Sequence, residues 1–144
     1  MKNTIEQLKT RLQVSRKTLI IYVVLYFCWG IMMNYIGQIT AIARFTWWWQ
    51  VITCYILYMI PISLLVRDLK WYEQYAYGLV AMALLEFGGY WLETSYAYPD
   101  NILDKVFGIR NFSLGMAIFF GFYFPLGNWA VGKLESLYDK IQHR

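Results

Sequence analysis

Histidine is nearly absent from this chain of 144 residues, and its scarcity excludes several kinds of chemistry. Haem held by two histidines, di-iron histidine boxes, zinc-protease helices and Ser–His hydrolases need imidazoles within the fold, whereas the single His143 lies in the C-terminal tail. The sequence also has only two cysteines, Cys28 and Cys54, which form no C-x-x-C pair and are expected to be buried packing residues. We therefore predict no metal site and no cofactor.

Charged residues are also scarce, at 15% of the chain, whereas 59% of the residues are hydrophobic and 20% are aromatic. Soluble domains carry roughly 25% charged residues, so this chain has too few charges to cover the surface of a soluble globule. The composition also excludes intrinsic disorder, a collagen-like fibre and a secreted disulfide scaffold. A polytopic membrane protein remains.

Long apolar runs divide the chain into four segments. Three runs of at least 22 residues contain no charged side chain, and a fourth contains only Glu86. A helix needs about 20 apolar residues to cross a bilayer, and continuous runs of this kind favour helices over barrel strands. The sequence therefore predicts an all-α integral membrane protein with a four-helix transmembrane bundle at residues 18–137. The expected spans are 18–36, 46–66, 74–95 and 112–132.

The basic residues are distributed unequally between the two sides of this predicted bundle. Ten Lys and Arg side chains lie in the two terminal tails and in the link between the second and third spans, against three in the other loops. The positive-inside rule then places both termini, including the tail 138–144, in the cytoplasm of a cell whose cytoplasmic membrane holds the protein. Basic residues split among short tails without an aromatic platform do not indicate nucleic-acid binding.

Two segments outside the spans carry helix signals. Residues 1–17 are predicted to form a cytoplasmic amphipathic helix that anchors on anionic lipid, with a capping box starting at Thr4. In the outer loop, Asp100 is a plausible N-cap and Gly108 a plausible end of a short helix. Trp47–Trp49 is expected to belong to an aromatic belt at the outer interface.

The third span places its single charge on a defined face. Spacings of three and four residues align one stripe, which consists of Tyr75, Leu79, Met82, Glu86, Tyr90 and Glu93. The opposite stripe contains only Val80, Leu84, Phe87 and Trp91. We therefore expect Glu86 to point into the bundle and the opposite stripe to face lipid. The pair Gly88–Gly89 would let another backbone come close.

Polar and small residues of the other spans form matching faces. In the first span Gly30, Asn34 and Gln38 align, and in the second the candidates are Gln50, Thr53 and Pro61. In the fourth, a helix-packing face comprises Ser113, Ala117, Gly121, Pro125, Asn128 and Gly132. Most of these polar groups are expected in the extracytoplasmic half of the bundle, and Asn128 is the exception, nearer the cytoplasm.

Glu86 is the main functional candidate, because a charged carboxylate at mid-depth costs roughly 2.5–3.5 kcal/mol on insertion scales. The structural alternative is a hydrogen bond from Glu86 to Asn34 or Gln50. The predicted ligand-binding set is Glu86, Tyr90, Asn34, Gln38, Gln50, Asn128 and Arg110.

Three functions remain open. The first is a non-enzymatic module that binds a lipid, a small apolar ligand or a membrane subunit in an outer-half cavity around Glu86. The second is an oligomeric transporter or channel that couples transport to a proton on Glu86. The third is an isoprenoid- or lipid-modifying enzyme that uses Glu86 and Glu93 for metal-free acid–base catalysis. The expected partners are membrane lipids and either further copies of the chain or another membrane subunit.

Overall fold

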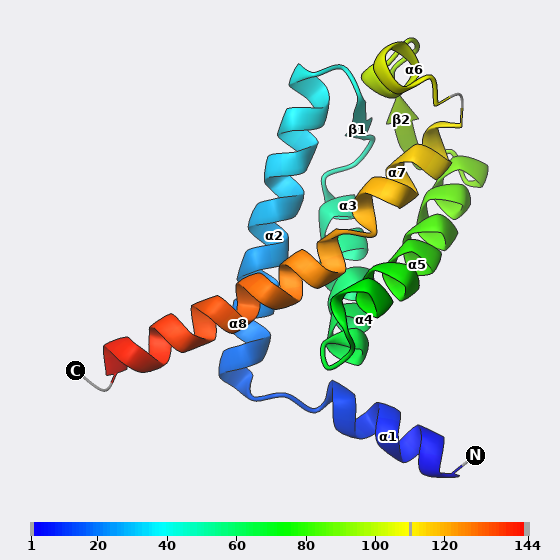
Figure 1. Ribbon diagram of the computed structural model, residues 1–144. Coiled ribbons are helices and arrows are strands. Elements are labelled where there is room, and N and C mark those ends of the chain that lie inside the picture. Colours follow the sequence, from blue (N-terminus) through cyan, green and yellow to red (C-terminus); the bar gives the residue numbers. More distant parts are fainter. Residues whose placement is uncertain (1, 110, 143–144) are drawn as a thin grey trace.

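The computed structural model describes residues 2–109 and 111–142 and is mostly helical, with 78% of its residues in helices (Figure 1). Three helical stretches are long and apolar enough to cross a membrane: Arg16–Ile39, Trp49–Val66 and Phe112–Gln142. The prediction of a mostly helical protein with helices that suit a membrane is therefore confirmed.

The first two of these stretches stand side by side in the bundle (Figure 1). Ser15 caps the first by accepting a hydrogen bond from the Thr18 N–H at 3.0 Å. The second is a continuous helical run of three segments. Its middle segment is a π-helix, which ends two residues before Pro61. Proline has no N–H to donate to the preceding turn, and the wider π turn occupies that position. These elements are α2 (Arg16–Ile39), α3 (Trp49–Val51), η1 (Ile52–Met59) and α4 (Ile60–Val66).

The next helix, α5 (Trp71–Trp91), has 21 residues but is not among the three stretches apolar enough to qualify as spans. Its predicted faces are largely confirmed: Met82 is buried, and the four members of the predicted lipid stripe are exposed. Tyr90, predicted to face inward, is 75% exposed. That prediction is wrong because eight residues beyond Met82 a helix has turned about 80° past two full turns.

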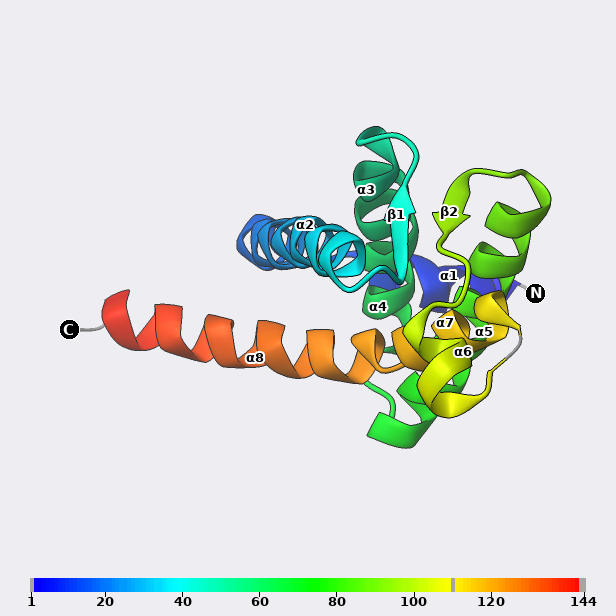
Figure 2. The ribbon, with the colours of Figure 1, turned by 90° about the horizontal axis from the view of Figure 1, so that it is seen from above.

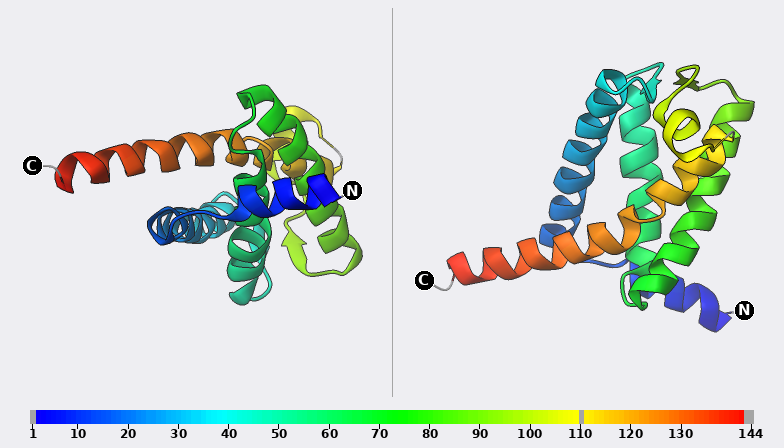
Figure 3. Two further views of the ribbon diagram at one scale, coloured as in Figure 1. Left: turned by 90° about the horizontal axis from the view of Figure 1, so that it is seen from below. Right: turned by 45° about the horizontal axis from the view of Figure 1, so that its top comes forward.

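The third membrane-length stretch consists of α7 (Phe112–Phe120) and α8 (Tyr123–Gln142), which meet at a break. Ser113, Ala117 and Gly121 are buried, and α7 packs along α5, as the small-residue face predicts. Gly132 of the same predicted face is exposed, because the chain changes direction at the break and the end of α8 projects from the bundle (Figure 3).

The inclination of α8 follows from where it meets α2. The Tyr26 hydroxyl donates to the Tyr123 carbonyl at 3.3 Å, and the Lys17 ammonium pairs with Asp139. These contacts join the start and the far part of α8 to the first half of α2, and α8 is inclined to α2. Figure 2 shows this crossing, with α2 viewed nearly down its axis and α8 along its length.

One end of the bundle, called the strand end below, is covered by β1 (Ala43–Phe45), β2 (Ser95–Ala97) and α6 (Ile102–Phe107). The two strands pair antiparallel. Gly108 ends α6 in the left-handed conformation, as predicted, with φ 63°. The N-cap is Asn101, whose side chain accepts from the Leu103 N–H at 3.0 Å. The expectation of Asp100 as the cap is wrong, because Asp100 takes a left-handed turn conformation one residue too early.

The opposite end, called the α1 end, carries α1 (Lys2–Leu12), which packs beneath α4 (Figure 1). The Arg11 guanidinium donates to the Leu65 carbonyl at 2.8 Å. Ile5, Leu8 and Leu12 are exposed, so the helix keeps an unpartnered apolar side. The predicted capping box at Thr4 is wrong, because the helix already includes Thr4 in its first turn.

Candidate functional site

A cavity of about 700 Å³ lies in the half of the bundle next to the strand end. Its walls come from α2, the α3–η1 segment, α5 and α7, and β1 and α6 contribute further residues. Several wall residues are also exposed on the outside of the bundle, among them Ile36 on α2 and Phe119 on α7. The cavity therefore reaches the lateral, apolar surface of the protein.

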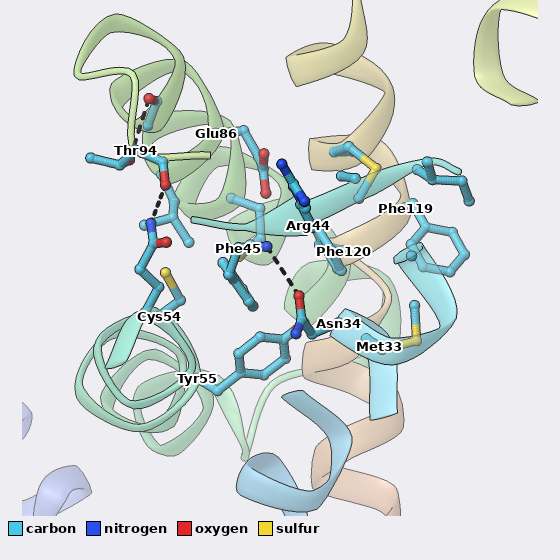
Figure 4. Close-up of a pocket in the computed structure, with 18 of the residues that line it drawn as sticks. Met33, Asn34, Arg44, Phe45, Cys54, Tyr55, Glu86, Thr94, Phe119 and Phe120 are labelled. Carbon is cyan, nitrogen blue, oxygen red and sulfur yellow. Dashed lines mark hydrogen bonds between the residues drawn. The ribbon is translucent and has the colours of Figure 1, made fainter. Parts of the chain in front are cut away.

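Eight aromatic residues and four methionines are among the 30 residues that line the cavity. Phe45, Tyr55, Phe119 and Phe120 surround the space drawn in Figure 4, together with Met33. The remaining wall methionines are Met59, Met82 and Met116. Methionine is flexible and polarizable, so such a wall adapts to apolar ligands of different shapes. The cavity also has the size typical of sites for small molecules.

Glu86 is the only acidic residue among the described residues of the wall. Its side chain extends from α5 and is partly buried (Figure 4). Among the described residues, none donates a hydrogen bond to the Glu86 carboxylate, and none forms an ion pair with it within 4 Å. The predicted bonds from Glu86 to Asn34 or Gln50 are absent. The inward orientation of Glu86 expected from the helical stripe agrees with its place in the wall.

Asn34 and Gln50 also line the cavity, but they hold the strand end in place. The side-chain carbonyl of Asn34 accepts a hydrogen bond from the Phe45 N–H at 3.0 Å and thereby fixes β1 against α2. The buried Gln50 accepts the Trp47 N–H at 2.7 Å and donates to the Thr94 carbonyl, just before β2. Both amides therefore support the cavity wall, and Figure 4 shows the bond between Asn34 and Phe45.

Among the described residues, Arg44 is the only basic one that lines the cavity. Its guanidinium lies over the ring of Tyr96, its cross-strand partner, with 5.0 Å to the ring centroid. Figure 4 shows Arg44 extending into the same region as Glu86. The exposed Arg44 is thus held by a cation–π contact on the strand pair.

Several predicted site residues do not reach the cavity. Gln38 is exposed, because α2 turns Gly37 inward, where the Ala43 carbonyl would lie 2.6 Å from an added Cβ. Tyr90 of the predicted ligand-binding set and Glu93 of the predicted catalytic pair are exposed and are not part of the wall. The acid pair that the enzyme hypothesis requires is therefore not assembled in the cavity. Arg110 of the ligand-binding set lies outside the described residues.

Asn128 lies instead in a polar network near the α1 end. Its side-chain carbonyl accepts a hydrogen bond from the Tyr22 hydroxyl at 2.7 Å. Its side-chain NH₂ group donates to the side-chain carbonyl of Gln74 at 2.8 Å and to the backbone carbonyl of Ser63 at 3.2 Å. Gln74 donates in turn to the Leu69 carbonyl at 2.8 Å. The network joins α2, α4, α5 and α8 with every Asn128 group used, which makes Asn128 a packing residue.

The glycines beside Glu86 have a different role from the one predicted. Both Gly88 and Gly89 line the cavity, and a Cβ added at Gly88 would meet nothing within 4 Å. They therefore widen the cavity and do not admit a second helix. The close approach occurs at Gly78, where an added Cβ would overlap the Phe124 ring and lie 3.0 Å from the Gly121 carbonyl oxygen.

The two cysteines differ. Cys54 is partly buried in the cavity wall, whereas Cys28 is exposed, contrary to expectation. α2 makes its main contacts through Tyr22, Tyr26 and Gly30, and Cys28 lies between two of these on the outer side.

The aromatic wall itself was missed by sequence reasoning. Tyr55 and Phe120 carry no sequence signal that separates them from the many other aromatic residues. Gly30 is a partial signal for this wall, because only a residue without a side chain fits there: an added Cβ would lie 2.8 Å from the Tyr55 ring.

No protein-family model, curated protein or solved structure matches this chain, so the assignment of a function depends on the cavity alone.

Proposed function

We propose that this protein is a non-enzymatic membrane protein that binds a lipid or another small apolar molecule in the cavity around Glu86. The observation that carries the proposal is a laterally open cavity of about 700 Å³ whose only acid is not used by the described fold. A ligand held between rings and thioethers gains from apolar burial, and a few convergent polar groups orient it.

In this proposal the bundle has four spans, with α5 as the span beside the three that qualify by length and composition. A helix of 21 residues covers about 31 Å, close to the thickness of the hydrocarbon core. Its exposed apolar stripe, including Val80 and Trp91, suits contact with lipid. The distribution of basic residues then puts the α1 end in the cytoplasm and the cavity in the outer leaflet.

The test uses a long-chain alcohol that carries a photoreactive diazirine, added to the purified protein in detergent. Crosslinked peptides, identified by mass spectrometry, are expected to concentrate on cavity residues such as Met82, Met116 and Phe120. The variant Gly88→Leu should lower this labelling at least fivefold, because Gly88 lines the cavity and a Cβ added there has open space around it, so that the leucine side chain takes up ligand volume.

Gly132→Leu is the matched control, because an added Cβ at Gly132 also meets nothing within 4 Å but Gly132 is not part of the cavity wall. Its labelling pattern should equal that of the wild type. Labelling spread evenly over the apolar surface and insensitive to Gly88→Leu would contradict the proposal.

A second candidate function is proton-coupled transport. The break between α7 and α8 adjoins one wall of the cavity, and the π-helix η1 forms another, so both walls contain irregular helices suited to movement. Proton flux into proteoliposomes, measured with a pH-sensitive dye, should then fall in Glu86→Ala. Equal flux in the wild type and the variant would remove this candidate.

A further inference from the structure

The cavity is asymmetric in charge. Among the described residues, Glu86 is its only acid, and the one basic wall residue, Arg44, is exposed and held over the Tyr96 ring. A carboxylate in an apolar site is costly unless a cation or donor accompanies it. Because none of the described residues forms a bond to Glu86, a bound ligand is the natural source of that partner.

The rings of the wall favour a cation over a neutral donor. Aromatic faces attract positive charge, and the attraction grows when water is excluded. Phe45, Tyr55 and Phe120 lie in the same space as the Glu86 carboxylate (Figure 4). A neutral hydroxyl would use the carboxylate but gain little from these faces, whereas a large organic cation uses both.

The lateral position of the cavity restricts the ligand further. Ile36 and Phe119 line the cavity and are exposed on the outer surface of the bundle, on α2 and α7. At the strand end, β1 and α6 cover the cavity, and Asn34 and Gln50 hold this cover in place. A ligand that dissolves in the membrane reaches the cavity from the side.

From these observations we propose that the ligand is a lipophilic cation, an apolar molecule with one positive charge that rests on the Glu86 carboxylate. This inference rests on the proposed function and narrows it to one class of ligand. Arg44 opposes such a ligand, since its guanidinium carries the same charge and lies at the same cavity.

The test compares two ions of nearly the same shape, tetraphenylphosphonium and tetraphenylborate, by equilibrium dialysis against the purified protein in detergent. The wild type should bind the cation at least tenfold more tightly than the anion. Glu86→Gln should weaken cation binding at least tenfold, whereas Glu93→Gln, which changes an exposed acid outside the cavity, should leave it unchanged. Glu86→Asp should restore part of the affinity.

Arg44→Gln supplies an independent arm, because removal of a competing positive charge should leave cation binding equal or tighter. A loss as large as that of Glu86→Gln would overturn the inference. So would equal affinity for the two ions, or cation binding that is insensitive to Glu86→Gln.

Labelling with the neutral photoreactive alcohol separates these failures from failure of the proposed function. If Glu86→Gln keeps wild-type alcohol labelling, the variant is folded and its cavity is open. Alcohol labelling without selectivity for the cation rejects the cation and retains an apolar-ligand protein. The absence of cavity labelling in the wild type rejects both.

Discussion

The two halves of the bundle differ in how their central polar side chain is hydrogen-bonded. Near the α1 end, the hydrogen-bonding groups of Asn128 are satisfied by Tyr22, Gln74 and Ser63 from three other elements. Near the strand end, Glu86 lines an open cavity and forms no bond with the described residues. The helices also converge differently, since Gly78 packs against Phe124 whereas Gly88 faces empty space.

This contrast separates the residues that hold the helices together from those available for a ligand. Polar groups within a membrane associate helices when they are paired, and an unpaired one is retained where function requires it. The half near the α1 end is therefore a structural clamp. The half near the strand end forms the adaptable cavity for a ligand. Variants of the clamp should therefore show their effect in stability assays, and variants of the cavity in ligand-binding assays.

The largest loss of stability is expected from Asn128→Leu. The change removes three hydrogen bonds and leaves the Tyr22 hydroxyl and the side-chain carbonyl of Gln74 without a partner in a buried region. At about 1–3 kcal/mol for each of these two orphaned groups, the loss is roughly 2–6 kcal/mol. Unfolding by SDS titration measures it.

Gln38→Leu is the control for Asn128→Leu, because Gln38 is an exposed amide on α2 and should change stability by about 0.5 kcal/mol or less. Photolabelling of the cavity should persist in folded Asn128→Leu protein. Equal stability of the two variants would show that the network does not clamp the bundle.

A pair of glycine variants in α5 compares the two halves directly. Gly78→Ala should destabilise the protein by about 1–3 kcal/mol, since the new methyl group overlaps the fully buried Phe124 ring. Gly88→Ala should stabilise it by about 0.5–1 kcal/mol, because alanine lowers the entropic cost of the helix and meets no neighbour. SDS titration of both variants is the measurement, and effects of the same sign would contradict the contrast.

Gln50→Ala should loosen only the strand end. It removes two hydrogen bonds, to the Trp47 N–H and the Thr94 carbonyl, which together contribute about 1–2 kcal/mol. Hydrogen exchange followed by mass spectrometry should rise in peptides that cover β1 and β2. Exchange around Asn128 should match the wild type, and a rise there as well would mean that the two halves do not respond separately.

Much of the fold could be predicted from charge and spacing. The apolar runs located the helices, and the stripe on α5 identified Met82 and Glu86 as facing inward and Val80 as facing outward. Such patterns succeed where one regular helix presents the same faces along its length. Tyr90 marks the limit, because a stripe extended over two turns drifts around the helix.

The candidate site was harder to predict, because it depends on irregular backbone. The π-helix alters the spacing of buried residues after Gln50, and the break at Gly121 redirects α8, so that Gly132 is exposed. Neither feature follows from a 3.6-residue period. Asn128 and Asn34 are the same residue type in apolar surroundings, yet one is a clamp and the other supports β1. Only the three-dimensional contacts separate these roles.

The smallest effect is expected at the boundary between the two halves, where two buried tyrosines differ in their partners. The Tyr26 hydroxyl bonds with Ser63 and with the Tyr123 carbonyl, whereas the Tyr123 hydroxyl has no partner among the described residues. Tyr26→Phe should therefore cost about 1 kcal/mol, and Tyr123→Phe should be neutral or stabilising by up to about 1 kcal/mol, because it removes an unsatisfied buried group. SDS titration of both variants distinguishes these outcomes. Destabilisation by Tyr123→Phe equal to that by Tyr26→Phe would mean that this hydroxyl has a partner in the membrane, and the clamp would then extend to the edge of the cavity.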